Sequence, residues 1–265
     1  LKRLGLKPVV VSRVGNDEQG AELKKFLEDN GMETRFIETD KKLATSEVLV
    51  HLDESRNATY EICEPVAWDN ITETEALKKV FAAADLIIFG SLAQRNKTTR
   101  ETLLHLLEKS QATRLLDVNL RPPSDTPGIV EQLFHVADFV KLNDEELVKI
   151  AGWKNKDGSE KELMAWLSDF YQSETVCVTR GANGAAFFID GKFYEHPGFE
   201  VEATDTVGAG DSFLAALIAG LSRKQTPQNA LKFACAVGAF VASQHGAVPE
   251  YSEVDIENLM DKKQV

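Results

Sequence analysis

A glycine-rich turn delivers one carboxylate to the start of an apolar segment within residues 203–221 (ATDTVGAGDSFLAALIAGL). Gly208, Ala209 and Gly210 form the turn and Asp211 follows, with a helix predicted over about 212–221. Glycine lets the backbone approach a ligand closely, and the first amides of a helix have no intrahelical acceptors. The turn therefore suits an oxyanion such as a transferring phosphoryl group.

Asp211 gives this turn a second role. A carboxylate repels phosphate, so anion binding alone does not explain it, whereas a hydroxyl that must lose a proton needs a base there. We interpret Asp211 as a candidate general base. The alternative is an ordinary helix cap, because Asp is a favoured capping residue. Other phosphate motifs fit poorly, since the chain has no Walker A sequence and Phe213 stands where a Rossmann fingerprint needs Gly or Ala.

The elements that must position this turn alternate between strand and helix. Strands are predicted over 8–14, 85–91, 113–119, 138–143 and 174–179, and helices over 18–30, 73–83, 98–109, 128–136, 144–151, 159–171, 227–244 and 253–260. Alternation at this spacing predicts an α/β fold with a doubly wound, mostly parallel sheet flanked by helices. Ligands of such sheets lie at the carboxyl ends of the strands.

Polar residues follow these strand ends. Asp117, Asn119 and Arg121 alternate along DVNLRPP, so we expect them to project to one side, where Arg suits phosphate or carboxylate contact. A carboxylate–arginine bridge that closes the loop is the alternative. A further turn, TRGANG at 179–184, precedes a hairpin predicted to turn at Asp190-Gly191.

The sequence pattern between residues 34 and 64 indicates short strands in place of alternating strands and helices. Apolar residues recur at every second position, Val48, Val50 and Leu52, which predicts antiparallel strands over about 34–64 with a turn near 53–57, forming a small sheet beside the main domain. A plain edge hairpin is the alternative. Trp68 beside Asp69 in the following loop is a familiar sugar-binding pair, although packing of Trp68 and helix capping by Asp69 or Thr72 explain it equally well.

Composition limits the classes of function. The 265 residues suit one large α/β domain, and 30 basic against 42 acidic residues give a net charge of -12, which argues against nonspecific nucleic-acid or membrane-surface binding. Cys63, Cys177 and Cys235 show no CxxC spacing and are expected to be reduced core thiols. No signal peptide and no apolar run of about 20 residues is visible, so a cytoplasmic location is expected.

Three segments resemble the ribokinase (PfkB) family of sugar kinases: DTVGAGD with the following SFLAALIAGL, SRVGNDEQG at 12–20, and YEICEPVAWDNI at 60–71, the last typical of the fructokinase branch. The resemblance implies a single ribokinase-like domain over 1–265, an antiparallel β lid at about 34–64 that also serves a homodimer, and ATP-dependent phosphorylation of a sugar hydroxyl, with fructose as the expected sugar. The chain opens on a helix tail and strand, so the family's first strand and substrate loop are expected to lie outside it.

The same resemblance implies roles for individual residues. Asp211 would be the base and the amides of Gly208, Ala209 and Gly210 the anion hole. The implied sugar-site residues are Asp117, Asn119, Arg121 and Trp68; the implied ATP-site residues are Asn143, Thr179, Gly181, Gly184, Gly208 and Gly210. Glu146 would bind Mg²⁺ through water, and Asp205 and Val207, with carbonyls of 243–247, would hold K⁺. An adenine-flanking position that is often Asn in the family is Cys235 here.

Alternatives remain within and outside this class. A kinase for 2-keto-3-deoxygluconate, ribose or a nucleoside is the first, and an acidic sugar would use Arg95 or Arg121. A non-catalytic protein that binds nucleotide or sugar is the second, although a binding-only site gains nothing from Asp211 beside phosphate. A Rossmann oxidoreductase is the weakest, because its fingerprint is absent.

Overall fold

The computed structural model describes residues 1–52, 58–122 and 125–261. Its chain forms two compact units. The first contains residues 1–7, 115–120 and those from 130 onward, and the second contains residues 8–114 and 121–129. The turn predicted near 53–57 and the second proline of the RPP sequence lie outside the described residues. That the whole chain acts as one domain stays a prediction.

The sheet of the first unit has the strand order β10-β9-β8-β7-β6. Its strands are β6 (Thr113–Asp117), whose last three residues belong to this unit, β7 (Phe139–Asn143), β8 (Thr175–Thr179), β9 (Ala185–Ile189) and β10 (Lys192–His196). β6, β7 and β8 run parallel, whereas β9 and β10 are antiparallel to their neighbours. Asp190 and Gly191 have φ of 52° and 70°, as a tight hairpin turn requires. The predicted mostly parallel sheet is confirmed, with an antiparallel edge.

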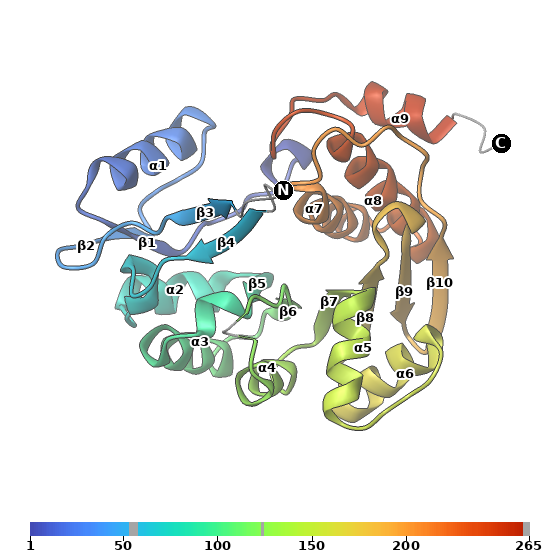
Figure 1. The fold of residues 1–265 in the computed structure, drawn as a ribbon, viewed down its shortest axis with the longest axis horizontal. Helices are drawn as coiled ribbons and strands as arrows, with labels where there is room; N and C mark the ends of the chain where they lie inside the picture. The colour runs from blue at the N-terminus through green and yellow to red at the C-terminus, as the bar shows by residue number, and fades with distance from the viewer. Residues whose placement is uncertain (53–57, 123–124, 262–265) are drawn as a thin grey trace. The chain divides into compact units, whose positions relative to one another are not determined.

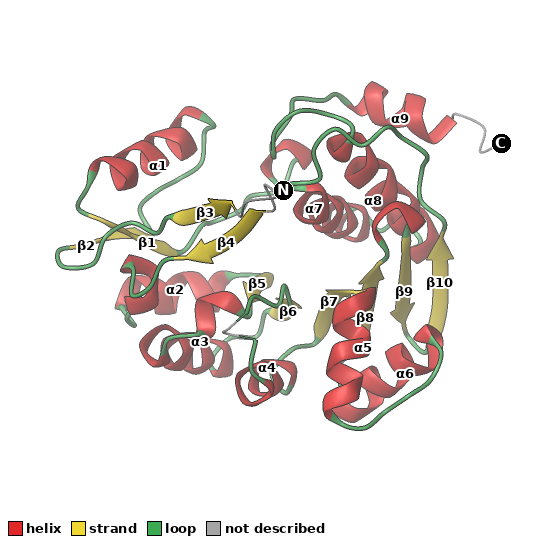
Figure 2. Cartoon of the chain, in the orientation of Figure 1, coloured by secondary structure: helices red, strands yellow, loops and turns green. Residues whose placement is uncertain are grey.

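Helices flank this sheet (Figure 1, Figure 2). They are α4 (Pro127–Phe134), α5 (Asp144–Trp153), α6 (Glu160–Tyr171), α7 (Ala209–Ser222), α8 (Pro227–Ala242) and α9 (Glu253–Asp261), with short 3₁₀ turns η1 (Lys2–Leu4) and η4 (Gly181–Asn183). α5 contacts β7 and β8, α6 contacts β8, and α8 contacts β9 and β10. α7 and α8 approach closely because small residues meet there: a Cβ on Gly220 would lie 3.0 Å from the Cβ of Ala230.

The core of the first unit consists of strands that are covered on both faces. Val140 and Leu142 of β7, and Val176 and Val178 of β8, have no exposed surface. A central parallel strand packed between helices is expected to be apolar throughout, and burying one such side chain contributes about 1.5–3 kcal/mol. Lys141 is nevertheless buried in the middle of β7. A charged side chain at that place requires an explanation from its surroundings.

The second unit contains the N-terminal strands and helices. They are β1 (Ser12–Gly15), α1 (Glu18–Asp29), β2 (Ile37–Asp40), β3 (Val48–Leu52), β4 (Ala58–Ile62), η2 (Ala67–Asn70), α2 (Glu75–Ala83), β5 (Leu86–Gly90), η3 (Leu92–Gln94) and α3 (Lys97–Glu108). α1 begins where the Asp17 carboxylate accepts a hydrogen bond from the Gly20 amide at 2.8 Å. Phe36, Leu77 and Leu106 form a buried cluster in this unit.

The predicted antiparallel sheet over 34–64 needs one correction. β3 and β4 do form an antiparallel pair, but β2 pairs with β1 in parallel. The reason is topological: α1 lies between β1 and β2, and a strand that returns through a helix joins its partner in parallel. The small antiparallel sheet therefore consists of β3 and β4.

Three predicted boundaries or caps also differ. The strand predicted from Pro8 begins at Ser12, and the helix predicted from residue 212 begins at Ala209. The glycine-rich sequence is thus the first turn of α7, where few intrahelical bonds exist to be lost. Thr74, rather than Asp69 or Thr72, caps α2, because its hydroxyl accepts from the Leu77 amide at 3.2 Å.

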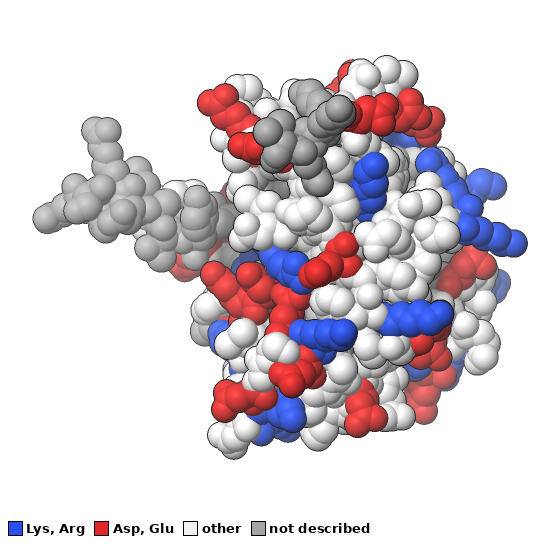
Figure 3. Space-filling view, turned by 90° about the vertical axis from the view of Figure 1, so that its right-hand side faces the viewer, with Lys and Arg blue, Asp and Glu red and all other residues white. Residues whose placement is uncertain are grey.

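The surface charges, the helix lengths and the cysteines can be compared with what the composition predicted. Basic and acidic side chains are interspersed on the face seen in Figure 3. Among the described residues, no helix is long and apolar enough to cross a membrane. Cys177 and Cys235 are buried free thiols, as predicted for all three cysteines, whereas the free thiol of Cys63 is only partly buried.

Candidate active site

The turn before α7 has a conformation that glycine alone adopts easily. Gly208 caps the helix with φ of +80°, and a Cβ at this position would lie 2.3 Å from the carbonyl oxygen of Ala247. A side chain there would be strained and would also collide with backbone. Asp211 is the third residue of α7, and its side chain is exposed. The helix start and its carboxylate are therefore open to a ligand.

The free amides of this turn differ from the predicted set. The Ala209 amide donates to the Thr206 carbonyl at 3.2 Å. Within the described part of the chain, the amides of Gly208, Gly210 and Asp211 have no acceptor. Such amides, with the positive end of the helix dipole, form a site for an anion. We therefore replace Ala209 by Asp211 in the proposed donor set.

Asp205 ties this turn to the loop that follows α8. Its Oδ1 accepts from the Val207 amide at 3.0 Å and its Oδ2 accepts from the Gly246 amide at 3.2 Å. The same loop places the Ala247 carbonyl against Gly208. Arg3 of η1 donates to the carbonyls of Val248 and Pro249, which fixes the far end of the loop. The 244–249 loop thus braces the turn from outside.

Asp117, at the carboxyl end of β6, forms a buried ion pair with Lys141 in the middle of β7. The Lys141 Nζ lies 2.9 Å from the Asp117 Oδ1, and both side chains are buried. Burial raises the pKa of Asp117, an effect that Lys141 opposes and that the charges of Asp211 and Glu146 reinforce. The Nζ also lies 3.6 Å from the position a Cβ would take on Gly210. The pair therefore lies next to the first turn of α7.

Asn143 and Glu146 form a capping box at the start of α5. The Glu146 amide donates to the Asn143 side chain at 2.7 Å, and the Asn143 amide donates to Glu146 Oε2 at 2.9 Å. Glu146 Oε1 accepts from the Leu120 amide at 2.7 Å. The carboxylate thus holds the loop after β6 against the start of α5. Capping accounts for this motif locally, while a water-mediated metal role stays a prediction.

The DVNLRPP segment is not extended as predicted. Asn119 has φ of 44°, a left-handed conformation that Asn tolerates well. The alternation that would project three side chains to one side therefore stops at Asn119. Asp117 is buried and Asn119 partly buried in the first unit, whereas Arg121 is exposed and belongs to the second unit.

The TRGANG turn at 179–184 is held by contacts with neighbouring side chains and backbone. The Arg180 guanidinium binds the Glu160 carboxylate at 2.6 Å and the Glu195 carboxylate at 3.3 Å, so its charge is balanced by acidic neighbours. A Cβ on Gly184 would lie 2.0 Å from the His196 carbonyl oxygen. Gly181 has φ of +56° with open space around it. Of the two glycines, Gly181 is the one with room for a ligand.

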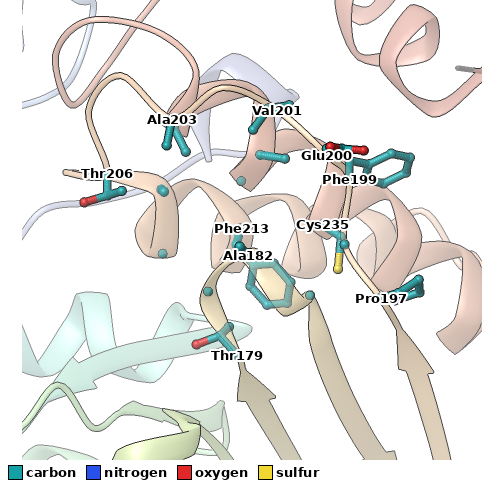
Figure 4. A pocket seen from close by; sticks show the side chains of 18 of the residues that line it. Thr179, Ala182, Pro197, Phe199, Glu200, Val201, Ala203, Thr206, Phe213 and Cys235 are labelled. Carbon is teal, nitrogen blue, oxygen red and sulfur yellow. The ribbon is translucent and has the colours of Figure 1, made fainter. Parts of the chain in front are cut away.

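A pocket of about 1010 Å³ lies within the first unit (Figure 4). Its lining includes residues predicted for ATP, namely Asn143, Thr179, Gly181, Gly184 and Gly210. Apolar residues that the sequence analysis did not assign, Phe199, Gly238, Ala239, Ala242 and Leu259, line it as well. Figure 4 shows Thr179 at the end of its strand and Thr206 in the loop that enters α7. Nothing in the local sequence marks Phe199 or Leu259 as pocket residues.

Cys235 also lines this pocket. Its thiol is buried, which raises the pKa to about 12 and keeps the sulfur protonated at neutral pH. A protonated thiol is a weak hydrogen-bonding group that packs much as a small apolar side chain does. The position therefore suits an aromatic ring better than a charged group.

In the second unit, Trp68 stacks against Arg95, which is also paired with Asp69. The Arg95 guanidinium carbon is 4.1 Å from the centre of the Trp68 ring. Its nitrogens donate to both Asp69 oxygens at 2.8 Å and to the Cys63 carbonyl at 2.7 Å. Arg95, Asp69 and Trp68 are thus one packed group. Whether Trp68 also contacts sugar stays a prediction.

Lys141 is the functional candidate that sequence reasoning missed. Its signal was a single charged residue within the apolar strand FVKLN. Such a residue is rare in a strand buried on both faces. Periodicity alone identified the strand correctly and gave no reason to single out its lysine.

The family of the chain follows from comparison with known proteins. Residues 1–253 match the pfkB family of carbohydrate kinases. Fructokinase-2 of Solanum lycopersicum is 28% identical over 93% of this chain and 79% of its own length. The fructokinase of Klebsiella pneumoniae is 28% identical over 93% of this chain and 83% of its own length.

Solved structures agree. The fructokinase of Vibrio cholerae O395, in its fructose, ADP and calcium ion bound form, has a TM-score of 0.82 at 25% identity, covering 98% of this chain and 87% of its own. A double mutant of that enzyme was solved with fructose, ADP and potassium ion. The predicted ribokinase-like fold is confirmed. The chain therefore belongs to the pfkB family of carbohydrate kinases and is an ATP-dependent sugar kinase.

Proposed function

We propose that the chain phosphorylates fructose, with Asp211 as the general base. The observation that carries this proposal is the start of α7, where three amides without acceptors and an exposed carboxylate stand together beside the pocket. Fructokinases are the relatives that support fructose as the sugar.

In this mechanism the sugar hydroxyl lies between the Asp211 carboxylate and the γ-phosphorus of ATP. The hydroxyl oxygen forms its bond to phosphorus as the bond to the bridging oxygen of ADP breaks. Asp211 accepts the hydroxyl proton, and ADP leaves with the electron pair. The amides of Gly208 and Gly210 meet the charge on the transferring group, and one such preorganised donor is worth about 3 kcal/mol in other enzymes.

The pocket fits a nucleotide by its two kinds of lining. Asn143, Thr179 and Gly181 supply polar groups and open backbone near α7, and Phe199 with Cys235 supplies apolar surface elsewhere in the pocket. Ligand pockets commonly combine an apolar wall with a few polar groups that fix orientation. We therefore assign the ATP phosphates to the first set and the adenine to the second.

A metal ion would enter with the nucleotide. Among the described residues, no three carboxylate, histidine or cysteine side chains cluster as a metal site. Mg²⁺ keeps several waters and needs few protein ligands, so Glu146, next to the pocket-lining Glu145, fits an indirect contact. When bound, Mg²⁺ would offset charge on the phosphate oxygens.

Potassium is the second proposed ion. Asp205, the Val207 carbonyl and carbonyls of residues 243–247 are hard oxygen ligands on the outer side of the turn. The carboxylate already holds the amides of Val207 and Gly246, which fixes the loop from which those carbonyls come. The potassium-bound fructokinase of Vibrio cholerae supports testing this ion first.

The alternative of an acidic sugar relied on Arg95 or Arg121 to bind the substrate carboxylate, and Arg95 is already paired with Asp69. Arg95 would have to release both oxygens of Asp69 to bind a substrate carboxylate. Breaking a buried ion pair leaves an uncompensated charge, which is strongly unfavourable. Arg121 is the other arginine named for that alternative, and ribose or a nucleoside requires no arginine.

The lid and the dimer are proposals as well. Val48 and Val50 lie on one face of β3 and are each 54% exposed. Apolar residues on an exposed strand face are typical of a surface that a partner or a substrate covers. We propose that β3 and β4 close over the sugar and that this face pairs two copies of the chain.

The test is ADP release from MgATP with fructose, ribose, glucose, 2-keto-3-deoxygluconate and adenosine, with and without potassium. We expect the highest kcat/KM with fructose. Preference for another sugar would keep the mechanism and replace the substrate. Absence of turnover with every substrate, in a chain that binds ATP, would favour the non-catalytic binding protein.

A further inference from the structure

Lys141 is buried where a lysine is unfavourable. It interrupts an apolar strand and is 6% exposed, between Val140 and Leu142, which have no exposed surface. Transfer of an ammonium group out of water costs several kcal/mol unless a partner and hydrogen bonds replace the water. Asp117 provides one partner at 2.9 Å. An ammonium has three donors, so this contact does not use its full capacity.

The position of the ammonium relative to α7 is the second observation. It lies 3.6 Å from the place of a Cβ on Gly210, the second residue of the helix. A cation at a helix N-terminus has the wrong sign for the helix dipole, since anions are favoured there. The arrangement becomes favourable when an anion lies between the free amides and the ammonium.

The charges around the turn lead to the same conclusion. The negative charges of Asp211 and Glu146 both act on the Asp117 carboxylate and raise its pKa, while the positive charge of Lys141 acts on it in the opposite direction. A phosphoryl group would add further negative charge at that place. A fixed positive charge within the group would offset the repulsion that these carboxylates exert on it.

We propose that Lys141 is a further catalytic residue, whose ammonium donates to a non-bridging oxygen of the transferring phosphoryl group while Asp117 holds it in place. This inference rests on the proposed phosphoryl transfer at the start of α7. The competing explanation is that Lys141 serves only as the partner of Asp117. The two explanations predict different effects on kcat when Lys141 is replaced in a variant whose residue 117 is uncharged.

The experiment is a double-mutant cycle with Lys141→Met, Asp117→Asn and the double variant, measured by kcat, KM and thermal unfolding. We expect Lys141→Met to lower kcat about 100-fold or more, the usual effect of losing one preorganised donor. We also expect the double variant to be about 100-fold slower than Asp117→Asn. Equal kcat in these last two would overturn the proposal, because Lys141 would then act through Asp117 alone.

Two further variants control for packing. Lys154 pairs with Glu131 at 2.9 Å and stands apart from the proposed site, so Lys154→Met should keep kcat within about twofold, as surface pairs contribute little. Lys141→Arg keeps the charge and should retain more activity than Lys141→Met. If Lys141→Met does not fold, the double variant still decides, because it leaves no unpaired buried charge.

A binding measurement separates failure of this inference from failure of the proposed function. Lys141→Met should weaken ATP about tenfold while leaving ADP within about twofold, since only ATP presents the transferring group to the ammonium. This readout needs no sugar turnover. Equal loss for ATP and ADP would overturn the role of Lys141 even if the wild-type chain phosphorylates fructose. Selective loss for ATP in a chain without turnover would refute only the proposed reaction.

Discussion

Two glycine-containing turns line the same pocket and are built differently. The turn before α7, residues 205–211, keeps the amides of Gly208 and Gly210 without acceptors among the described residues. The turn after β8, residues 179–184, commits its charged side chain to Glu160 and packs Gly184 against the β10 backbone. The first turn is arranged to meet a ligand, and the second is arranged to keep its shape.

The comparison shows that glycine content by itself does not identify a phosphate site. Gly184 is required because the carbonyl of His196 would collide with a Cβ, whether or not a ligand binds. Gly208 is required for a similar steric reason, yet its turn also leaves donors unsatisfied. What distinguishes a binding turn is therefore the set of backbone groups that the fold leaves without partners.

The largest expected effect concerns the carboxylate that only the first turn carries. Asp211→Asn keeps the size of the side chain and removes its ability to accept a proton. We expect kcat to fall about 1,000-fold or more, within the range that a positioned base contributes, while the affinities for ATP and sugar and the unfolding temperature stay near wild type. Steady-state kinetics and calorimetry measure these quantities. A fall of less than tenfold would remove Asp211 from the role of base.

The next test substitutes matched glycines in the two turns. Gly208 and Gly181 both have positive φ, but a Cβ meets the Ala247 carbonyl at 2.3 Å in the first and open space in the second. Gly181→Ala should therefore cost only the left-handed strain, about 1–2 kcal/mol, and should raise the KM for ATP more than it lowers kcat, because the added methyl group enters the space assigned to the phosphates. Gly208→Ala should lose more stability and at least about 100-fold in kcat, because the amides must move. Chemical denaturation and kinetics compare the two variants, and equal kcat would contradict the distinction.

A third test uses two capping boxes that share one local motif. Asn143–Glu146 starts α5 with a buried Glu146, and Ser159–Glu162 starts α6 with an exposed Glu162. In Glu146→Gln the new NH₂ group would face the amide of Asn143 or of Leu120, so we expect a loss of about 1–3 kcal/mol in the free energy of unfolding. Glu162→Gln should stay within about 0.5 kcal/mol. Urea unfolding decides, and equal losses would contradict the role of burial.

Much of the fold could be predicted from local patterns, because apolar runs and caps determine the strands and helices directly. The hairpin at Asp190-Gly191 and the helix that Asp17 caps are examples. The pairing of β2 with β1 was missed because strand partners depend on topology and not on the alternation within a strand. For the same reason the buried Lys141, the left-handed Asn119 and the pocket residue Phe199 required three-dimensional contacts to be understood.

The smallest expected effect concerns the support of the second turn. His196 is buried, and its Nδ1 accepts from the Gly198 amide at 3.1 Å, so the neutral ring is the form that the fold uses. Burial lowers the pKa of His196 in the folded chain. The unfolded chain then takes up the proton more readily, so stability that is present above about pH 6.5 is lost as the pH falls. In thermal unfolding between pH 7 and pH 5, His196→Gln should flatten the decline by a few degrees, whereas a matched change at the exposed His245 should not. An unchanged slope in His196→Gln would show that other groups cause the acid sensitivity.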